Sequence, residues 1–146
     1  MANKTNYFAA LIQNAIFQNS SAAQAEIGAM VPAIAFFTAG ISATSSQVGV
    51  GNTEATGTGY ARIAAATIAA AFGTAASGNP SVITNDGALT TAAVGAGGWG
   101  TITSWALVDI TPATDTILLF ATGYNLTPTS GQTLQWAVGN LSLTET

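Results

Sequence analysis

The chain has 146 residues with no cysteine and no histidine, and charged residues make up only 5% of it. Without these two residue types, disulfides, zinc sites with thiolate or imidazole ligands and Ser-His or Cys-His nucleophile systems are excluded. Two cations stand against six acids, for a net charge of −4, and so cannot neutralise a row of phosphates. Neither nucleic acid nor a membrane is therefore an expected partner.

The length suits one domain with its own core, and we expect residues 1–146 to form a single domain. A surface with so few charges suits a subunit covered by neighbours, because mixed charges keep domains apart in solution. A monomer kept soluble by Thr, Ser and Asn is the alternative. No targeting segment is predicted, since Gln13 and Asn14 interrupt the apolar run that a signal peptide needs. The most apolar window, Ile27–Ile41, is too short for a bilayer span and is predicted to be core.

An amphipathic helix is predicted at roughly residues 5–19. Its apolar positions follow helical spacing: Phe8, Leu11, Ile12, Ala15 and Ile16. Asn3 or Thr5 can act as the N-cap. The polar residues 19–21 end the helix, because their side chains compete for backbone hydrogen bonds.

The run "YARIAAATIAAAF", Tyr60–Phe72, is ambiguous between helix and strand. Ala is the best helix former, and Ile68 and Phe72 form an i, i+4 pair. Against a helix, the run has no polar face at helical spacing and no good N-cap, and the chain after it is punctuated like a β protein. We therefore predict one strand, or two strand segments separated by a bend.

Short apolar runs bounded by turn-forming residues predict β-strands from Val31 onward. The strand-sized runs are Val31–Thr38, Gly100–Ile110, Ile117–Thr122 and Thr133–Val138. Together with the helix, they predict a mainly β chain: an antiparallel β-sandwich or jelly-roll-like fold with one N-terminal α-helix.

The last apolar runs differ in phase. In "TLQWAV" one strand face carries the larger apolar side chains, Leu134, Trp136 and Val138, and this face is predicted to be core. The following run, "LSLT", is out of phase by one residue. A bulge or a tight turn is therefore predicted at Gly139-Asn140.

Two kinds of motif could carry chemistry, and each has a structural alternative. "GAGGWG", Gly95–Gly100, matches the dinucleotide fingerprint, but the segment after it alternates as a strand, so we expect a glycine-rich turn. Asp86 and Asp115 are expected to be turn formers rather than an acid-base pair. Asp86 or Asp109 could bind calcium, although no dense acidic loop is present. No catalytic, cofactor-binding or metal-binding residue is assigned, and the chain is not expected to be an enzyme.

The three tryptophans could form a platform for a sugar ring. Trp105 and Trp136 lie inside alternating strands and are predicted to be core, which leaves Trp99, beside glycines, as the single exposed candidate. Arg62 is a lone cation in an apolar run and needs a partner. We expect it to pair with a carboxylate or with backbone carbonyls, within a subunit or between subunits.

The order of several stretches resembles that of a family of small tailed-phage virion proteins. The stretches are "NYFAALIQNAIFQN", "AIAFFTAG", "TEATGTGYARIA", "ITNDGALTTAAVGAGGWGTITSWALVD" and "ILLFATGYNLTPTSGQTLQWAVGNLSLT", and they span nearly the whole chain. The most specific signals are "GYAR", "WGTIT" and "SGQTLQWAVGNLSL". Members are often labelled tail fibre proteins, and similar small β-sandwich subunits serve as capsid decoration or cement proteins.

This resemblance implies a non-enzymatic virion structural protein. A small domain without coiled-coil heptads or a fibrous repeat is awkward for a fibre shaft, which favours the capsid exterior. The implied role is a capsid decoration (cement) protein, a homo-oligomer and specifically a trimer, docked on the major capsid protein or another virion protein. A tail fibre or tail adaptor protein is the alternative, and a carbohydrate-binding module is the second alternative.

Overall fold

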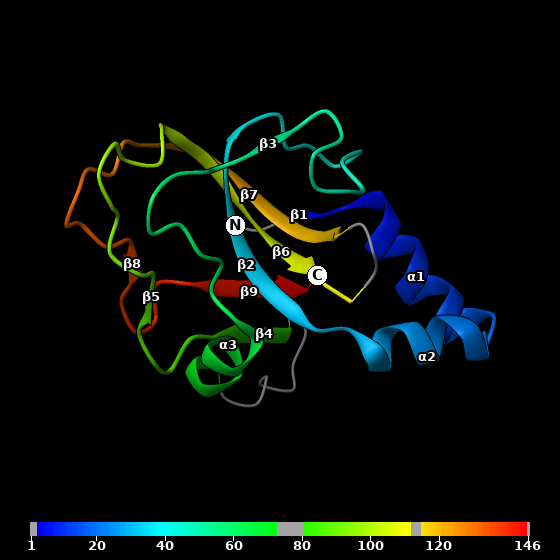
Figure 1. Cartoon of the computed structure of the whole chain (residues 1–146). Coiled ribbons are helices and arrows are strands. Elements are labelled where there is room, and N and C mark those ends of the chain that lie inside the picture. The colour runs from blue at the N-terminus through cyan, green and yellow to red at the C-terminus, as the bar shows by residue number, and fades with distance from the viewer. Residues whose placement is uncertain (1–2, 73–80, 112–114, 146) are drawn as a thin grey trace.

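The computed structural model describes residues 3–72, 81–111 and 115–145 (Figure 1). The elements in chain order are β1 (Asn3–Lys4), α1 (Asn6–Phe17), α2 (Ser21–Ala29), β2 (Pro32–Ala39), β3 (Thr53–Glu54), α3 (Ala65–Ala71), β4 (Ser81–Thr84), β5 (Leu89–Thr90), β6 (Ile102–Asp109), β7 (Thr116–Leu126), β8 (Gln135–Trp136) and β9 (Ser142–Glu145). The predicted mainly β fold class is confirmed. The described strands form an open five-stranded antiparallel sheet and two small two-stranded sheets.

The five-stranded sheet has the order β1-β7-β6-β2-β3. Its centre is built from the apolar runs predicted to be strands. Strand β2 pairs with β6 in unbroken register, from Pro32 opposite Asp109 to Phe37 opposite Ser104. The residues of β2 between its ends are buried without alternation, because both faces of the sheet are covered.

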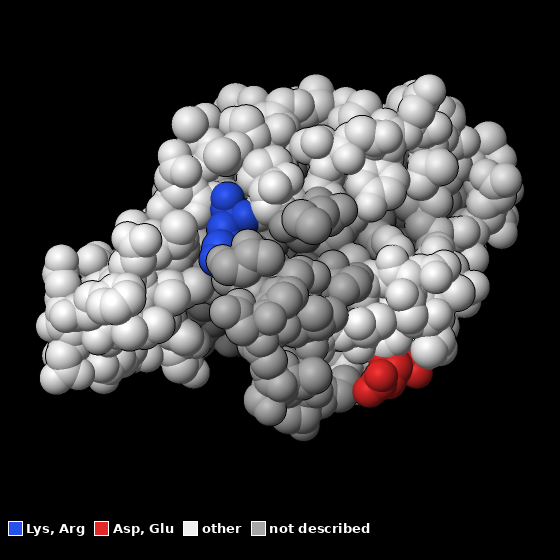
Figure 2. Space-filling view, turned by 180° about the vertical axis from the view of Figure 1, so that it is seen from behind, with Lys and Arg blue, Asp and Glu red and all other residues white. Residues whose placement is uncertain are grey.

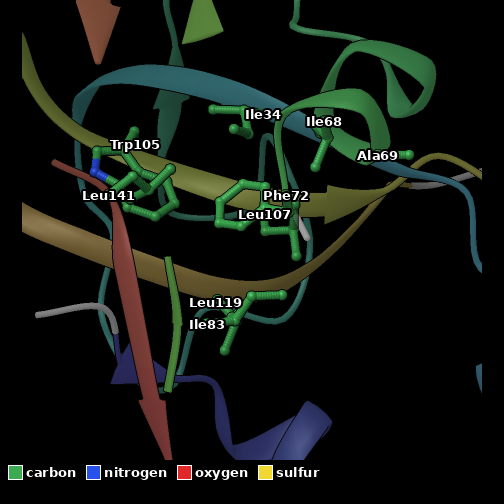
Figure 3. Close-up of a pocket in the computed structure, with 9 residues that line it drawn as sticks. All are labelled: Ile34, Ile68, Ala69, Phe72, Ile83, Trp105, Leu107, Leu119 and Leu141. Atoms are coloured by element: carbon green, nitrogen blue, oxygen red, sulfur yellow. The ribbon is translucent and has the colours of Figure 1, made fainter. Parts of the chain in front are cut away.

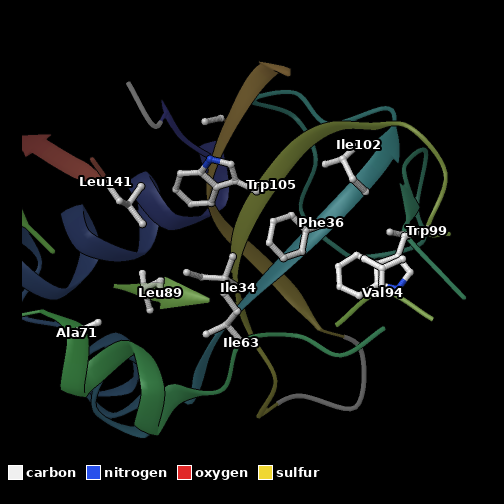
Figure 4. Packing of buried hydrophobic residues seen from close by; sticks show 12 residues of the cluster. Ile34, Phe36, Ile63, Ala71, Leu89, Val94, Trp99, Ile102, Trp105 and Leu141 are labelled. Atoms are coloured by element: carbon white, nitrogen blue, oxygen red, sulfur yellow. The ribbon is translucent and has the colours of Figure 1, made fainter. Parts of the chain in front are cut away.

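Each face of the sheet carries a separate apolar cluster. One face packs against α3 and the small sheets β4-β9 and β5-β8, and Figure 4 shows its cluster: Ile34, Phe36, Ala55, Ile63, Ala71, Leu89, Val94, Trp99, Ile102, Trp105, Ala121 and Leu141. The opposite face carries Ala33, Ala35, Phe37, Ala106, Val108, Ile117 and Phe120, against which Ile41 and Val48 pack. The layers are sandwich-like, with the second layer made of short pieces.

Helices α1 and α2 form a hairpin that projects to one side of the sheet (Figure 1). Helix α1 agrees with the predicted helix at residues 5–19, and Thr5 is its N-cap, accepting a hydrogen bond from the Phe8 N–H at 3.3 Å. Helix α2 was not predicted; Ser20 caps it by accepting from the Ala23 N–H at 3.3 Å. Asn19 joins the helices in a left-handed conformation with φ of 48°.

The prediction of a strand at Tyr60–Phe72 was wrong, because Ala65–Ala71 is helix α3. Ile68 and Phe72 are partly buried and pack against the core cluster at helical spacing. The other side of α3 exposes Ala66, Thr67, Ala69 and Ala70, so the helix lacks the charged or strongly polar face that sequence analysis expects of a surface helix. Ala tolerates water, so packing along one side is sufficient to hold the helix.

The C-terminal region follows the predicted change of phase. A tight turn spans residues 137–140, with the Asn140 N–H donating to the Ala137 carbonyl at 3.1 Å and Gly139 at a φ of 80°. The prediction that Leu134, Trp136 and Val138 share a core face is only partly correct. Trp136 is partly buried against the core, but the Val138 side chain is 60% exposed, since the chain enters the turn there.

Candidate functional site

Arg62 lies at the centre of a charged cluster. Its guanidinium binds Glu54 through two hydrogen bonds, Nε to Oε1 at 2.7 Å and Nη2 to Oε2 at 2.6 Å. Its Nη1 donates to Oδ2 of Asp115 at 2.6 Å. The expected pairing of Arg62 with a carboxylate is confirmed, and its partners lie within the same subunit. Asp115 therefore has an ion-pairing role that its turn-like sequence context did not indicate.

Tyr60 extends this cluster into the core. Its hydroxyl donates to Glu54 Oε1 at 2.7 Å and accepts from the Phe36 N–H at 3.2 Å. Burial raises the pKa of Tyr60 far above its usual value, and the hydrogen bond to Glu54 adds to the rise. The hydrogen bonds that Arg62 donates to Glu54 also raise the pKa of Arg62. The cluster joins β3 to the starts of α3 and β7, and we assign it a structural role.

The acids considered as calcium ligands lie in different surroundings. Asp109 is buried, and its Oδ1 accepts from the Val31 N–H at 2.9 Å, the Thr111 N–H at 3.0 Å and the Thr111 hydroxyl at 2.8 Å. This carboxylate connects the start of β2 to the end of β6. Asp86 is exposed and lies within a bend. Among the described residues, no group of three or more acids is placed to hold a metal ion.

The "GAGGWG" motif is a turn that leads into strand β6, as predicted, so it lacks the helix that a dinucleotide site requires. Its glycines allow two backbone segments to touch. The Gly95 N–H donates to the Thr58 carbonyl at 2.8 Å. A Cβ on Gly57, whose φ is 142°, would lie 2.4 Å from the Gly98 oxygen.

The prediction that Trp99 is exposed was wrong: its side chain is only 2% exposed. Its Nε1 donates to the Thr58 carbonyl at 3.2 Å, and its ring meets Tyr60 edge-on with centroids 5.3 Å apart. The close approach of the two glycine-rich segments turns the indole inward. Trp99 therefore cannot form the sugar platform considered from the sequence.

The other two tryptophans line a groove at one end of the sheet. Trp105 is buried, as predicted, and its Nε1 donates to the Tyr124 hydroxyl at 3.0 Å. Trp136 stacks on Phe36 with centroids 5.6 Å apart and an interplanar angle of 14°. The groove has a volume of about 360 Å³ and is lined by Phe36, Ile102, Trp105, Tyr124, Leu126, Thr133, Leu134, Gln135 and Trp136.

A more polar hollow of about 570 Å³ continues this groove, because the two share Leu126, Thr133 and Leu134. It adds Asn125, Thr127, Pro128, Gly131 and Gln132. We call the two together the aromatic groove. Tyr124 and Asn125 were not predicted as site residues, although an aromatic and an amide side chain at the end of a long strand are a usable signal.

A separate cavity of about 210 Å³ lies between α3 and the sheet (Figure 3). Aliphatic and aromatic side chains line it: Ile34, Ile68, Ala69, Phe72, Ile83, Trp105, Leu107, Leu119 and Leu141. Ligand sites need a few placed polar groups to orient what they bind. This cavity has only the indole N–H of Trp105, which Tyr124 already accepts, so we assign it no function.

The end of the α1–α2 hairpin exposes large apolar side chains. Phe17 is 83% exposed and Ile16 is 65% exposed. On the face shown in Figure 2, charged side chains cover only small patches of the described surface. No helix in the described parts of the chain has the length and hydropathy to cross a lipid bilayer.

Comparisons of the chain with protein families, with curated proteins and with solved structures find no match. We therefore infer its function from its own residues and their arrangement.

Proposed function

We propose that this protein is a non-enzymatic structural subunit of a bacteriophage virion: a capsid decoration (cement) protein that forms a homo-oligomer, a trimer, on the capsid exterior. The observation that carries the proposal is the apolar end of the α1–α2 hairpin, where Phe17 and Ile16 lie in solvent. Burying one such side chain contributes about 1.5–3 kcal/mol. A projecting hairpin with this end is suited to contact a second subunit or the shell.

The charge distribution supports a location on the outer side of the shell. With two cations in the whole chain, and Arg62 engaged by Glu54 and Asp115, the protein has little means to bind packaged DNA. Its uncharged surface suits contacts with protein, and a specific stable contact needs about 1,000 Å² or more of buried area.

The shape of the chain supports a cement subunit over a fibre shaft. The longest described helix, α1, has 12 residues, which is short for a coiled-coil shaft. The strands instead form a layered body around one sheet. Placement in a phage particle comes from the resemblance of "GYAR", "WGTIT" and "SGQTLQWAVGNLSL" to small tailed-phage virion proteins.

The proposed mechanism is stabilisation by preferential binding. A subunit that binds the assembled shell better than its separated parts shifts the equilibrium toward the shell. In an oligomer, the second contact forms at high effective concentration once the first is made, which raises overall affinity without new chemistry.

The test is to mix purified protein with phage particles that lack it, then sediment and heat them. We expect the protein to sediment with the shells and to raise the temperature at which they open. Failure to sediment with shells would contradict the proposal. Sedimentation only with isolated tails would assign the protein to the tail, as a fibre or adaptor component.

A further inference from the structure

We propose that the aromatic groove binds a neutral saccharide, a function that goes beyond the structural role and does not depend on it. The groove has the size of a ligand site. Its aromatic part, at about 360 Å³, lies within the range of about 300–1,000 Å³ typical of small-molecule pockets. Because a cavity of about 150 Å³ holds benzene, this part has room for a substituted six-membered ring.

The walls of the aromatic part suit one face of a sugar ring. Four aromatic residues line it: Phe36 and Trp105 are buried, at 2% and 4% exposed, so Tyr124 and the partly buried Trp136 supply the accessible aromatic surface. The faces of aromatic rings carry negative potential, and one face of a pyranose ring presents polarised C–H groups. Such a face packs against aromatic side chains, while the hydroxyl groups at the ring edge stay available for hydrogen bonds.

The groove also has unused hydrogen-bonding capacity. The Tyr124 hydroxyl accepts from Trp105 but has no acceptor for its own proton among the described residues. Within residues 3–72, 81–111 and 115–145, the Trp136 indole N–H, the Thr133 hydroxyl and the Asn125 side-chain amide also make no hydrogen bond. These groups include both donors and acceptors, so they match ligand hydroxyl groups, which do both.

The absence of charge from the groove selects among ligands. None of the residues that line its two parts is acidic or basic. Phosphates and carboxylates are recognised mainly by Arg, Lys and charge-assisted hydrogen bonds. A nucleotide or an acidic sugar would therefore lose the hydration of its charged group in the groove without gaining an ionic partner. A neutral saccharide has no charged group to dehydrate.

The experiment titrates the full-length protein with neutral oligosaccharides of glucose, mannose, galactose and N-acetylglucosamine, and with sialylated and sulfated counterparts. Binding is followed by tryptophan fluorescence and by calorimetry. We expect at least one neutral oligosaccharide to bind and to change the fluorescence, because Trp105 and Trp136 line the groove. The proposal is overturned if no neutral oligosaccharide binds, or if the acidic ones bind more tightly.

Two variants locate the site. Tyr124→Phe and Asn125→Ala should each weaken binding about fivefold, the loss of one ordinary hydrogen bond. Asn125 is exposed and makes no side-chain hydrogen bond in the described structure, so its replacement leaves the fold intact. Tyr7→Phe, which removes a phenol hydroxyl on the hairpin that donates to Glu26, is the matched control.

Equal binding by Asn125→Ala, Tyr124→Phe and the parent protein would also overturn the proposal. Sedimentation with shells separates the two functions. We expect Asn125→Ala to sediment normally with shells while binding saccharide less tightly. Loss of shell binding by Asn125→Ala would show that the groove contacts the shell, and would overturn its assignment as a separate saccharide site.

Discussion

At the scale of single residues, Trp136 connects the small sheets to the main sheet. Its ring stacks on Phe36 and meets Trp105 edge-on, with centroids 5.6 Å apart in both pairs. Trp136→Ala should lower the free energy of unfolding by about 3 kcal/mol, since large aromatic truncations leave cavities. Val138→Ala, two positions away on an exposed side chain, should change it by less than about 0.5 kcal/mol. Urea unfolding measures both, and equal small effects would place Trp136 outside the core.

Tyr60 predicts a specific dependence of stability on pH. Burial raises its pKa in the folded protein, so above about pH 10 the unfolded chain loses the phenol proton while the folded chain keeps it. Fewer bound protons in the unfolded state mean that stability falls as pH rises. Below about pH 10 this contribution is fully present and constant.

The matched variant for this prediction is Tyr60→Phe, which cannot titrate. It should be less stable than the parent at neutral pH, because the hydrogen bonds to Glu54 and from Phe36 are lost. The difference between the two proteins should narrow above about pH 10. Urea unfolding at a series of alkaline pH values measures this difference, and a constant difference would contradict the assignment.

At the scale of elements, the contact between the two glycine-rich segments decides how Trp99 is buried. Gly57→Ala should destabilise the protein by more than about 1 kcal/mol, because the backbone of Gly98 cannot move away as a flexible side chain could. Gly131→Ala is a useful control: Gly131 also has a positive φ, of 84°, but a Cβ there meets no atom. Thermal unfolding should rank Gly57→Ala as the more damaging change. The reverse order would show that the close approach is not needed.

At the scale of the whole molecule, the exposed end of the hairpin should control association. Phe17→Asp should shift the protein from oligomer to monomer in sedimentation velocity runs, because a charge would have to be buried at the contact. Gln18→Asp adds the same charge at the neighbouring exposed position and should have a smaller effect. A monomeric parent protein, or an oligomer unaffected by Phe17→Asp, would exclude this end of the hairpin as the contact between subunits.

Local sequence information predicted much of the fold. The helical spacing of apolar residues placed α1, with Thr5 as one of two candidate N-caps, and the apolar runs placed β2, β6 and β7. The one-residue shift in apolar alternation between "TLQWAV" and "LSLT" located the turn before β9. These features depend on neighbours within a few positions, where backbone geometry decides which side chains share a face.

The candidate site was harder to predict than the fold. Trp105 was expected to be core, and it is buried, but the groove that it lines includes Tyr124 and Trp136 from distant parts of the chain. Trp99 looked exposed because glycines surround it. A groove exists only where separate segments meet imperfectly, and no local pattern encodes that.

Composition alone limits the side-chain chemistry open to this protein, because the sequence has no thiol, no imidazole and only two cations. The sequence also contains the short apolar runs, bounded by turn-forming residues, that make the chain mainly β. Contacts between distant segments decided the features for which a local sequence pattern fits two structures equally well. Ala suits helix and strand surfaces alike, so only packing of Ile68 and Phe72 on the core made α3 a helix. Likewise, Asp115 lies 53 residues from Arg62 and Thr58 lies 41 residues from Trp99, and the free energy of such contacts exists only once the chain has folded.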